Sequence, residues 1–380
     1  MNHPWLALTA SIFGLIIVYV VFTHLLQTSH ISDPIEVSPK MKGVCWVGGD
    51  SIAAHNISQV KEIGVDWISQ TPFGWMKGID SPVVVGGFER AWWGEADRGL
   101  RHTTKLASAQ GVKTILKPHI WLRSDDGKWR PDIAMNSEAE WQAWFESYGD
   151  WMMHYAVLAE ELGIELLCIG TELHQTTKTH PEEWRQMIRQ IKAVYSGELT
   201  YAANWYEEVI DVAFWDELDY IGVQAYYPLT RKTLPTRHDI EKGWKKPIRT
   251  LSELSKSYGK PVIFTEIGYK NTADAAREPW TWPQQMDDRI ERSENTQIEC
   301  YEGMFNALWD EPWLAGIFIW KWFHTTHRYE DPEIYWQAQE ERRRNWAKKR
   351  GRTYKPRDIY FTPQRTGAID VLRHWYQRPE

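Results

Sequence analysis

Cysteine is scarce in this chain, which has only Cys45, Cys168 and Cys300 among its 380 residues. Three cysteines cannot pair into a closed disulfide framework, and their spacing matches neither paired zinc ligands nor a Cys-x-x-Cys redox motif. We therefore expect buried free thiols.

An excess of positive charge is also lacking. Lys and Arg number 44 against 51 Asp and Glu, so the formal net charge at pH 7 is -7. A chain with this charge has little general attraction for a polyanion, which argues against a nucleic-acid partner. With 43% hydrophobic and 25% charged residues, the composition excludes a disordered, collagenous or multi-span membrane chain.

The N-terminus contains no Lys or Arg before Lys40, and residues 6–26 contain no charged side chain. Such a run is long enough to cross a bilayer as a helix, which needs about 20 apolar residues. A cleaved signal peptide normally has a shorter apolar region, a positive start and a small-residue cleavage site. We predict a membrane anchor, with a signal peptide as the alternative, over residues 1–27 and a polar stalk over 28–41.

The bilayer is thus an expected partner, through residues 6–26. A third interpretation, a helix buried in the protein core, remains open. The positive-inside rule gives no orientation because the N-terminal tail has no Lys or Arg. Because a single N-terminal helix can export the chain that follows it, the domain after the stalk is expected outside the cytoplasm, periplasmic or extracellular, and secreted if the segment is cleaved.

Short apolar runs alternate with helical patterns over residues 42–380. Most of these runs are continuously apolar, as is typical of parallel strands buried on both faces. The eight runs cover residues 42–49, 65–73, 112–122, 164–173, 199–205, 219–229, 261–269 and 315–323.

Helix signals separate these runs. Ser137 begins a capping box and an amphipathic pattern that predicts a helix over 137–162, and Pro181 begins another. Gly64, Gly111, Gly163 and Gly259 each stand just before a run, as helix C-caps do. Eight strand-helix units predict a (β/α)8 barrel. An open doubly wound sheet is the alternative, but no G-x-G-x-x-G follows the first run.

Two carboxylates follow buried apolar stretches. Run four ends in Gly-Thr-Glu172 and run seven in Thr-Glu266. Strand ends at the carboxyl side of a barrel form its active site, so these two side chains can converge there. A carboxylate pair is what glycosidic-bond cleavage requires. The alternative is that either Glu is a loop residue or a helix-capping charge.

Seven sequence segments, in order along the barrel, resemble the clan of retaining TIM-barrel glycosidases, and most closely the β-mannanase-type glycoside hydrolase family 113. The segments are WISQTPFGW (67–75), LKPHIWL (116–122), GKWR (127–130), IGTEL (169–173), YAANW (201–205), DYIGVQAYYP (219–228) and FTEIGY (264–269). The resemblance implies Glu172 as acid/base and Glu266 as nucleophile. It also implies that Tyr226 hydrogen-bonds the nucleophile and that Trp320 forms the floor of the cleavage subsite.

Further candidate substrate-binding residues lie near the other strand ends. The clan usually has Asn where this chain has Thr171, which puts the sugar at that subsite in doubt, and Asn204 is a candidate replacement. Lys117 and His119 are two residues apart in one run and so are expected to point to the same side as hydroxyl-binding donors. Gln70, at the end of run two, completes the set of candidates, and a structural role for His119 is the alternative to ligand binding.

The chain has 24 tryptophans, whose flat rings suit stacking on sugars but also fill protein cores. Candidate sugar platforms are Trp92, Trp93, Trp129, Trp205 and Trp322. The sequence thus predicts a retaining glycoside hydrolase of β-linked hexose polymers or oligosaccharides, most closely β-mannan, that needs no metal or cofactor. The alternatives are a glycosidase for another β-glycan and a non-catalytic carbohydrate-binding barrel.

Overall fold

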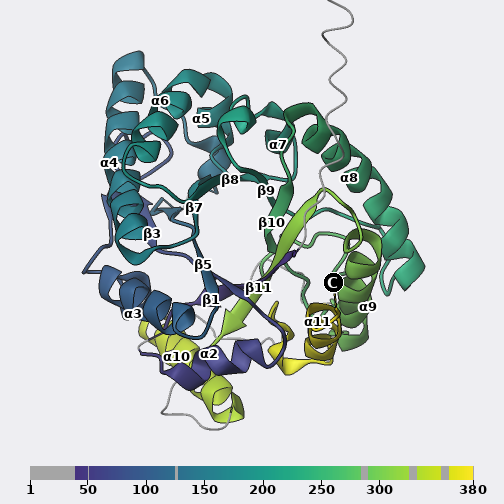
Figure 1. The fold of residues 1–380 in the computed structure, drawn as a ribbon. Coiled ribbons are helices and arrows are strands. Elements are labelled where there is room, and N and C mark those ends of the chain that lie inside the picture. Colours follow the sequence, from purple (N-terminus) through teal and green to yellow (C-terminus); the bar gives the residue numbers. More distant parts are fainter. Residues whose placement is uncertain are drawn as a thin grey trace, which may run out of the picture.

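The structure is a computed structural model that describes residues 39–49, 51–124, 127–283, 290–324, 332–351 and 359–379. Eight parallel strands close into a barrel with helices around it (Figure 1). In chain order the barrel strands are β1 (Met41–Val47), β2 (Trp67–Gln70), β5 (Lys113–Leu116), β7 (Leu166–Thr171), β8 (Glu198–Asn204), β9 (Tyr220–Gln224), β10 (Val262–Ile267) and β11 (Leu314–Phe323). Each apolar run of the sequence overlaps one of them, and β11 pairs with β1 to close the ring. The (β/α)8 prediction is confirmed.

The helices cover the outside of the barrel; most lie between consecutive strands, and the last two follow the final strand (Figure 1). They are α2 (Ala54–Lys61), α3 (Asp97–Ser108), α4 (Glu138–Leu162), α5 (His174–Thr179), α6 (Pro181–Lys192), α7 (Glu208–Asp211), α8 (Arg237–Tyr258), α9 (Glu294–Leu308), α10 (Pro332–Lys349) and α11 (Ala368–Tyr376). The predicted start of α4 is confirmed, because the Ser137 hydroxyl accepts from the Glu140 N–H at 3.3 Å. Gly163 ends α4 and Gly259 ends α8, both with φ 62°, a conformation that glycine adopts without steric cost.

Runs two and three differ from the prediction of single strands, because each is broken by a proline. Pro72 separates β2 from β3 (Phe73–Met76), and Pro118 separates β5 from β6 (His119–Leu122). Proline has no N–H for the ladder, so pairing stops there. With β4 (Val85–Gly86), β3 and β6 form a small separate sheet. Lys117 and His119 therefore lie on either side of a strand break rather than on one strand.

The barrel has two apolar clusters. Inside the ring are ten buried residues contributed by seven of its strands, among them Cys45, Cys168 and Phe318. A much larger cluster fills the space between the strands and the helices, and it includes four fully buried tryptophans, Trp144, Trp184, Trp215 and Trp244. Much of the tryptophan content therefore serves packing. All three cysteines are buried and free, as predicted.

No helix within the described residues is long and apolar enough to cross a membrane. The predicted anchor, residues 6–26, lies outside the described part of the chain, as does the stalk up to residue 38. Both remain predictions.

Candidate active site

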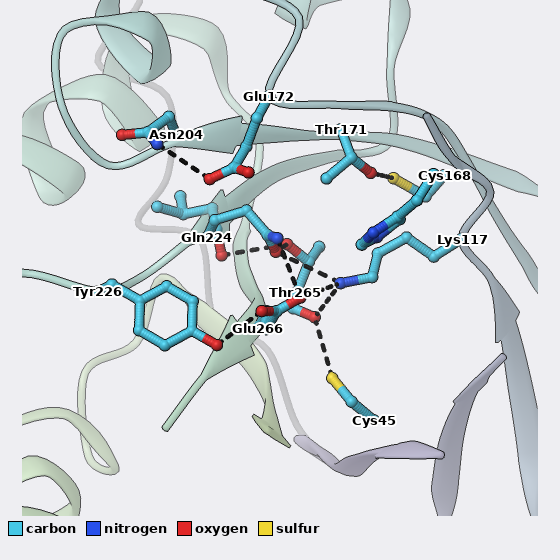
Figure 2. Close-up of polar contacts among 12 residues, drawn as sticks. Cys45, Lys117, Cys168, Thr171, Glu172, Asn204, Gln224, Tyr226, Thr265 and Glu266 are labelled. Carbon is cyan, nitrogen blue, oxygen red and sulfur yellow. Dashed lines mark hydrogen bonds and ion pairs between the residues drawn. The ribbon is translucent and has the colours of Figure 1, made fainter. Parts of the chain in front are cut away.

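Glu172 and Glu266 lie at the carboxyl ends of two barrel strands. Glu172 directly follows β7, and Glu266 is the fifth residue of β10. Because all strands of the ring are parallel, both carboxyl groups lie at the same end of the barrel, and Figure 2 shows them within one group of polar side chains. Glu172 has φ 53°, a conformation that residues with a Cβ adopt rarely and mostly at functional or constrained positions.

Three donors surround the Glu266 carboxylate (Figure 2). Lys117 Nζ and Gln224 Nε2 each lie 3.0 Å from Oε2, and the Tyr226 hydroxyl donates to Oε1 at 2.6 Å. Burial raises the pKa of Glu266, but the Lys117 charge and these hydrogen bonds outweigh it, so the pKa is lowered overall. The surroundings therefore hold Glu266 ionised, as a nucleophile requires.

Lys117 is fully buried and bonds only to protein atoms among the described residues. Besides Glu266 it contacts the Thr265 carbonyl at 3.1 Å and Gln224 Oε1 at 3.4 Å. Burial lowers the pKa of Lys117, but the Glu266 charge raises it above its usual value overall. The pair is a buried salt bridge. Lys117 was expected to bind sugar hydroxyls, and its ammonium instead contacts the Glu266 carboxylate.

Tyr226 lies two residues beyond β9 and is buried. Burial, and then the Glu266 charge, raise the pKa of Tyr226 well above its ordinary value. The hydroxyl therefore stays protonated and donates a hydrogen bond to the Glu266 carboxylate. This is the contact that the family resemblance implied.

The second carboxyl group has different partners. Arg130 Nη2 lies 2.6 Å from Glu172 Oε2, and Asn204 Nδ2 donates to Oε1 at 2.9 Å. Arg130, in the short 3-10 helix Arg130–Asp132, is itself buried, with its guanidinium 4.9 Å from the Trp129 ring. Asn204, a predicted substrate-binding residue, is thus in direct contact with the Glu172 carboxyl group.

His119 reaches this site through Arg130, whose Nη1 donates to His119 Nδ1 at 2.9 Å. Burial and then the Arg130 charge lower the pKa of His119 well below its usual value. The imidazole is neutral, and its proton is assigned to Nε2 because Nδ1 accepts from a guanidinium. Nε2 is buried and has no partner among the described residues. His119 therefore orients Arg130 from one side.

Three other predicted residues have different surroundings. Thr171 is buried with its hydroxyl 4.0 Å from Cys168 Sγ. Trp320 is half-buried, with the Lys321 ammonium 5.1 Å from its ring. Gln70, by contrast, donates to Thr104 of α3 at 2.8 Å. Gln70 therefore faces the helices, because alternation along β2 puts it on the outer side of the ring.

Aromatic residues lie near the catalytic end of the barrel. Trp205, next to Asn204, stacks on the exposed Trp280 at 5.5 Å between ring centroids. Trp280 also lines an open pocket of about 580 Å³ between the loops after β9 and β10, whose other lining residues are Pro228, Leu229, Thr230, Arg231, Arg277 and Glu278. Trp322, expected in or beside a loop as a sugar platform, is instead buried in β11 within the cluster between barrel and helices. Trp322 is therefore not a sugar platform.

Sequence reasoning assigned no role to Arg130 and Gln224. Both lie within the segments that carry the family resemblance, GKWR and DYIGVQAYYP. Gln224 ends β9 two residues before Tyr226, so strand alternation could have placed it on the same face. Nothing local marks Arg130, which is 42 residues from Glu172 in sequence.

Comparisons with known proteins agree with this geometry. The model of Glycoside Hydrolase Family 113 matches residues 47–338. The structure of the GH113 β-mannanase AaManA from Alicyclobacillus acidocaldarius is similar with a TM-score of 0.70 and 25% identity, over 89% of this chain and 97% of that one.

A second structure, a GH113 β-1,4-mannanase, gives a TM-score of 0.68 at 24% identity, over 90% of this chain and 99% of that one. No curated protein matches the chain. The family model covers more than half of the chain, and the barrel presents two carboxyl groups at its catalytic end. The chain belongs to glycoside hydrolase family 113 and is a hydrolase of O-glycosyl bonds.

Proposed function

We propose that this hydrolase cleaves β-linked mannan with retention of configuration, with Glu266 as nucleophile and Glu172 as acid/base. The observation that carries this proposal is the unequal surroundings of the two carboxyl groups. Glu266 is held ionised by Lys117, Tyr226 and Gln224, while Glu172 is held by Arg130 and Asn204. Different environments are what allow two carboxyl groups to take different roles.

In the first step Glu172 gives its proton to the glycosidic oxygen while Glu266 attacks the anomeric carbon. The bond to the leaving sugar breaks, and a covalent glycosyl-enzyme forms. In the second step Glu172 takes a proton from water, which attacks the same carbon and releases Glu266. Retention requires the carboxyl groups to be about 5–5.5 Å apart, against about 6.5–9.5 Å for inversion.

Mannan is the favoured substrate because the two similar structures are β-mannanases by name. Thr171 stands where the clan usually has Asn, a residue that contacts the sugar at the cleavage subsite, so another β-glycan is the alternative substrate. The Trp205–Trp280 pair, beside the site, is suited to stack on sugar units farther along the chain.

The test uses chain lacking the first 38 residues and a panel of defined β-linked oligosaccharides. We expect release of reducing ends from β-1,4-mannan, with the β-anomer formed first when products are followed by NMR. First formation of the α-anomer would overturn retention. No release from any β-glycan would leave a carbohydrate-binding barrel as the function.

Two variants separate the roles. Glu266→Ala should abolish turnover. Because it also leaves the buried Lys117 ammonium without its partner, circular dichroism must first show that the variant is folded. Glu172→Ala should spare substrates with good leaving groups, which need little acid assistance, and azide should restore its second step by replacing activated water. The reverse pattern would exchange the two assignments.

We further propose that residues 6–26 anchor the protein in a membrane with the barrel outside the cytoplasm. The absence of charge in this segment and of a cleavage site after it supports the proposal. Protease added to intact cells tests it: digestion of the barrel supports an outward face. Protection that persists after selective permeabilisation of an outer membrane would overturn it.

A further inference from the structure

A third carboxyl group, that of Glu208, lies behind Glu172. Glu208 is the first residue of α7 and is fully buried. Its Oε1 accepts from the Tyr201 hydroxyl at 2.6 Å, and its Oε2 accepts from the backbone N–H of Asn204 at 2.6 Å. Burying a carboxyl group is costly unless its oxygens are paired. The two hydrogen bonds therefore offset the cost of burying Glu208.

Asn204 connects Glu208 to the acid/base. Its side-chain Oδ1 accepts from the Tyr206 N–H at 2.9 Å, so the amide is oriented with Nδ2 towards Glu172, to which it donates at 2.9 Å. Glu208 holds the backbone N–H of the same residue. Both the backbone and the side chain of Asn204 are thus fixed.

A second connection runs through the backbone next to Glu172. The Tyr201 hydroxyl, which donates to Glu208, accepts from the N–H of Leu173 at 2.7 Å. Leu173 directly follows Glu172, whose own backbone is in the left-handed region with φ 53°. Glu208 is therefore connected to Glu172 by two routes. One runs through Asn204, which contacts the Glu172 side chain, and the other through Tyr201, which holds the backbone of Leu173.

The turn that brings Glu208 to this position is itself unusual. Glu207 has φ 51°, which is disfavoured for a residue with a Cβ and persists only where the surroundings impose it. Glu208 directly follows Glu207 and contacts Tyr201 and Asn204 of β8.

Charge also couples the two carboxyl groups. Burial, and to a smaller extent the Glu172 charge, raise the pKa of Glu208 to about 8, while the Tyr201 and Asn204 donors and the Arg130 charge oppose the rise. Asn204 contacts both carboxyl groups, so the two lie close enough to influence each other electrostatically.

From these contacts we infer that Glu208 is a positioning residue for the acid/base Glu172, acting through Asn204 and through the Tyr201–Leu173 bond. The inference rests on the proposed function. It assigns Glu208 no proton transfer and no contact with substrate.

This role has a signature that a purely structural role lacks. A residue that only supports the fold lowers activity on all substrates alike. A residue that positions the acid matters most when the leaving group needs a proton. General acid catalysis contributes about 10²–10⁴-fold, so partial misplacement should cost about tenfold on an unactivated oligosaccharide and much less on an activated aryl β-mannoside.

The experiment measures kcat/KM of Glu208→Ala and Glu208→Gln on both substrates, with Glu172→Ala in parallel. Glu208→Gln keeps the side-chain shape, so it tests the inference even if the alanine variant does not fold. Glu198→Ala is the matched control, because Glu198 also accepts from a tyrosine, Tyr220. It stands at the opposite end of the same strand, β8, and should change neither rate.

The double variant Asn204→Ala with Glu208→Gln tests the route. If Glu208 acts largely through Asn204, the double variant is about as slow as Asn204→Ala alone, because the two residues belong to one network. A selective loss on the unactivated substrate with non-additive effects supports the inference. Equal losses on both substrates, or fully additive losses, overturn it. If Glu172→Ala itself loses equally on both substrates, the proposed function fails first.

Discussion

Replacing Lys117 with methionine should both destabilise the protein and alter its pH dependence. The variant removes the ammonium but keeps an unbranched apolar side chain in a fully buried position. Lys117 Nζ lies 3.0 Å from Glu266 Oε2, with no exposed surface on the lysine side chain. Glu266 would keep only its Tyr226 and Gln224 donors.

The magnitude follows from the buried charge that is left behind. Unit charges at this distance attract by about 5 kcal/mol at an effective dielectric constant of about 20. Removing one partner of a buried pair typically costs about 3–5 kcal/mol. We expect a loss in the free energy of unfolding of this order at pH 7, measured by urea denaturation.

The Glu266 pKa determines how the stability loss of Lys117→Met changes with pH. In the wild type the pKa of Glu266 is lowered in the folded state, so its contribution to stability is present above the unfolded pKa and is lost as pH falls. In Lys117→Met the lysine charge no longer offsets the effect of burial on Glu266, so the pKa of Glu266 rises. The destabilisation should therefore be larger at pH 7 than at pH 4, and the acidic limb of kcat/KM should move to higher pH.

Lys113→Met is the control for Lys117→Met, since Lys113 begins the same strand, β5, with an exposed side chain. It should leave the pH profile unchanged and alter stability by no more than about 1 kcal/mol, the usual range for an exposed cation near a ring. A Lys117→Met protein with wild-type stability at pH 7 and an unmoved acidic limb would refute the reasoning.

Further outcomes can be measured. Tyr226→Phe removes a 2.6 Å bond to the nucleophile; hydrogen bonds to charged groups contribute about 1.5–3 kcal/mol, so kcat/KM should fall roughly 10–150-fold, and an unchanged rate would contradict the role. Because the pKa of Glu208 is raised to about 8, its contribution to stability falls as pH rises from about 4.5 to 8, a slope that Glu208→Gln should lack in denaturation. Trp280→Ala should raise KM for long but not short oligosaccharides. Full-length protein should sediment with membranes and need detergent, whereas chain without residues 6–26 should be soluble and equally active.

The arrangement of strands was readable from the sequence because burial on both faces leaves continuous apolar runs. Gly163 and Gly259 marked helix ends because left-handed backbone favours glycine. Glu172 and Glu266 could be assigned to the catalytic end because each follows a stretch of buried apolar residues, and parallel strands share one direction. These signals depend on neighbouring residues in the chain, so they could be predicted from the sequence alone.

The partners of those carboxyl groups were decided only by the closed barrel. Lys117 contacts Glu266 across 149 positions of sequence, and Arg130 contacts Glu172 from a short 3-10 helix outside the barrel strands. Whether Gln70 faced the lumen or the helices depended on the phase of β2, which an apolar run with no alternation does not reveal. Local pattern reports burial and direction, but ring closure and loop path decide which distant side chains come within hydrogen-bonding distance.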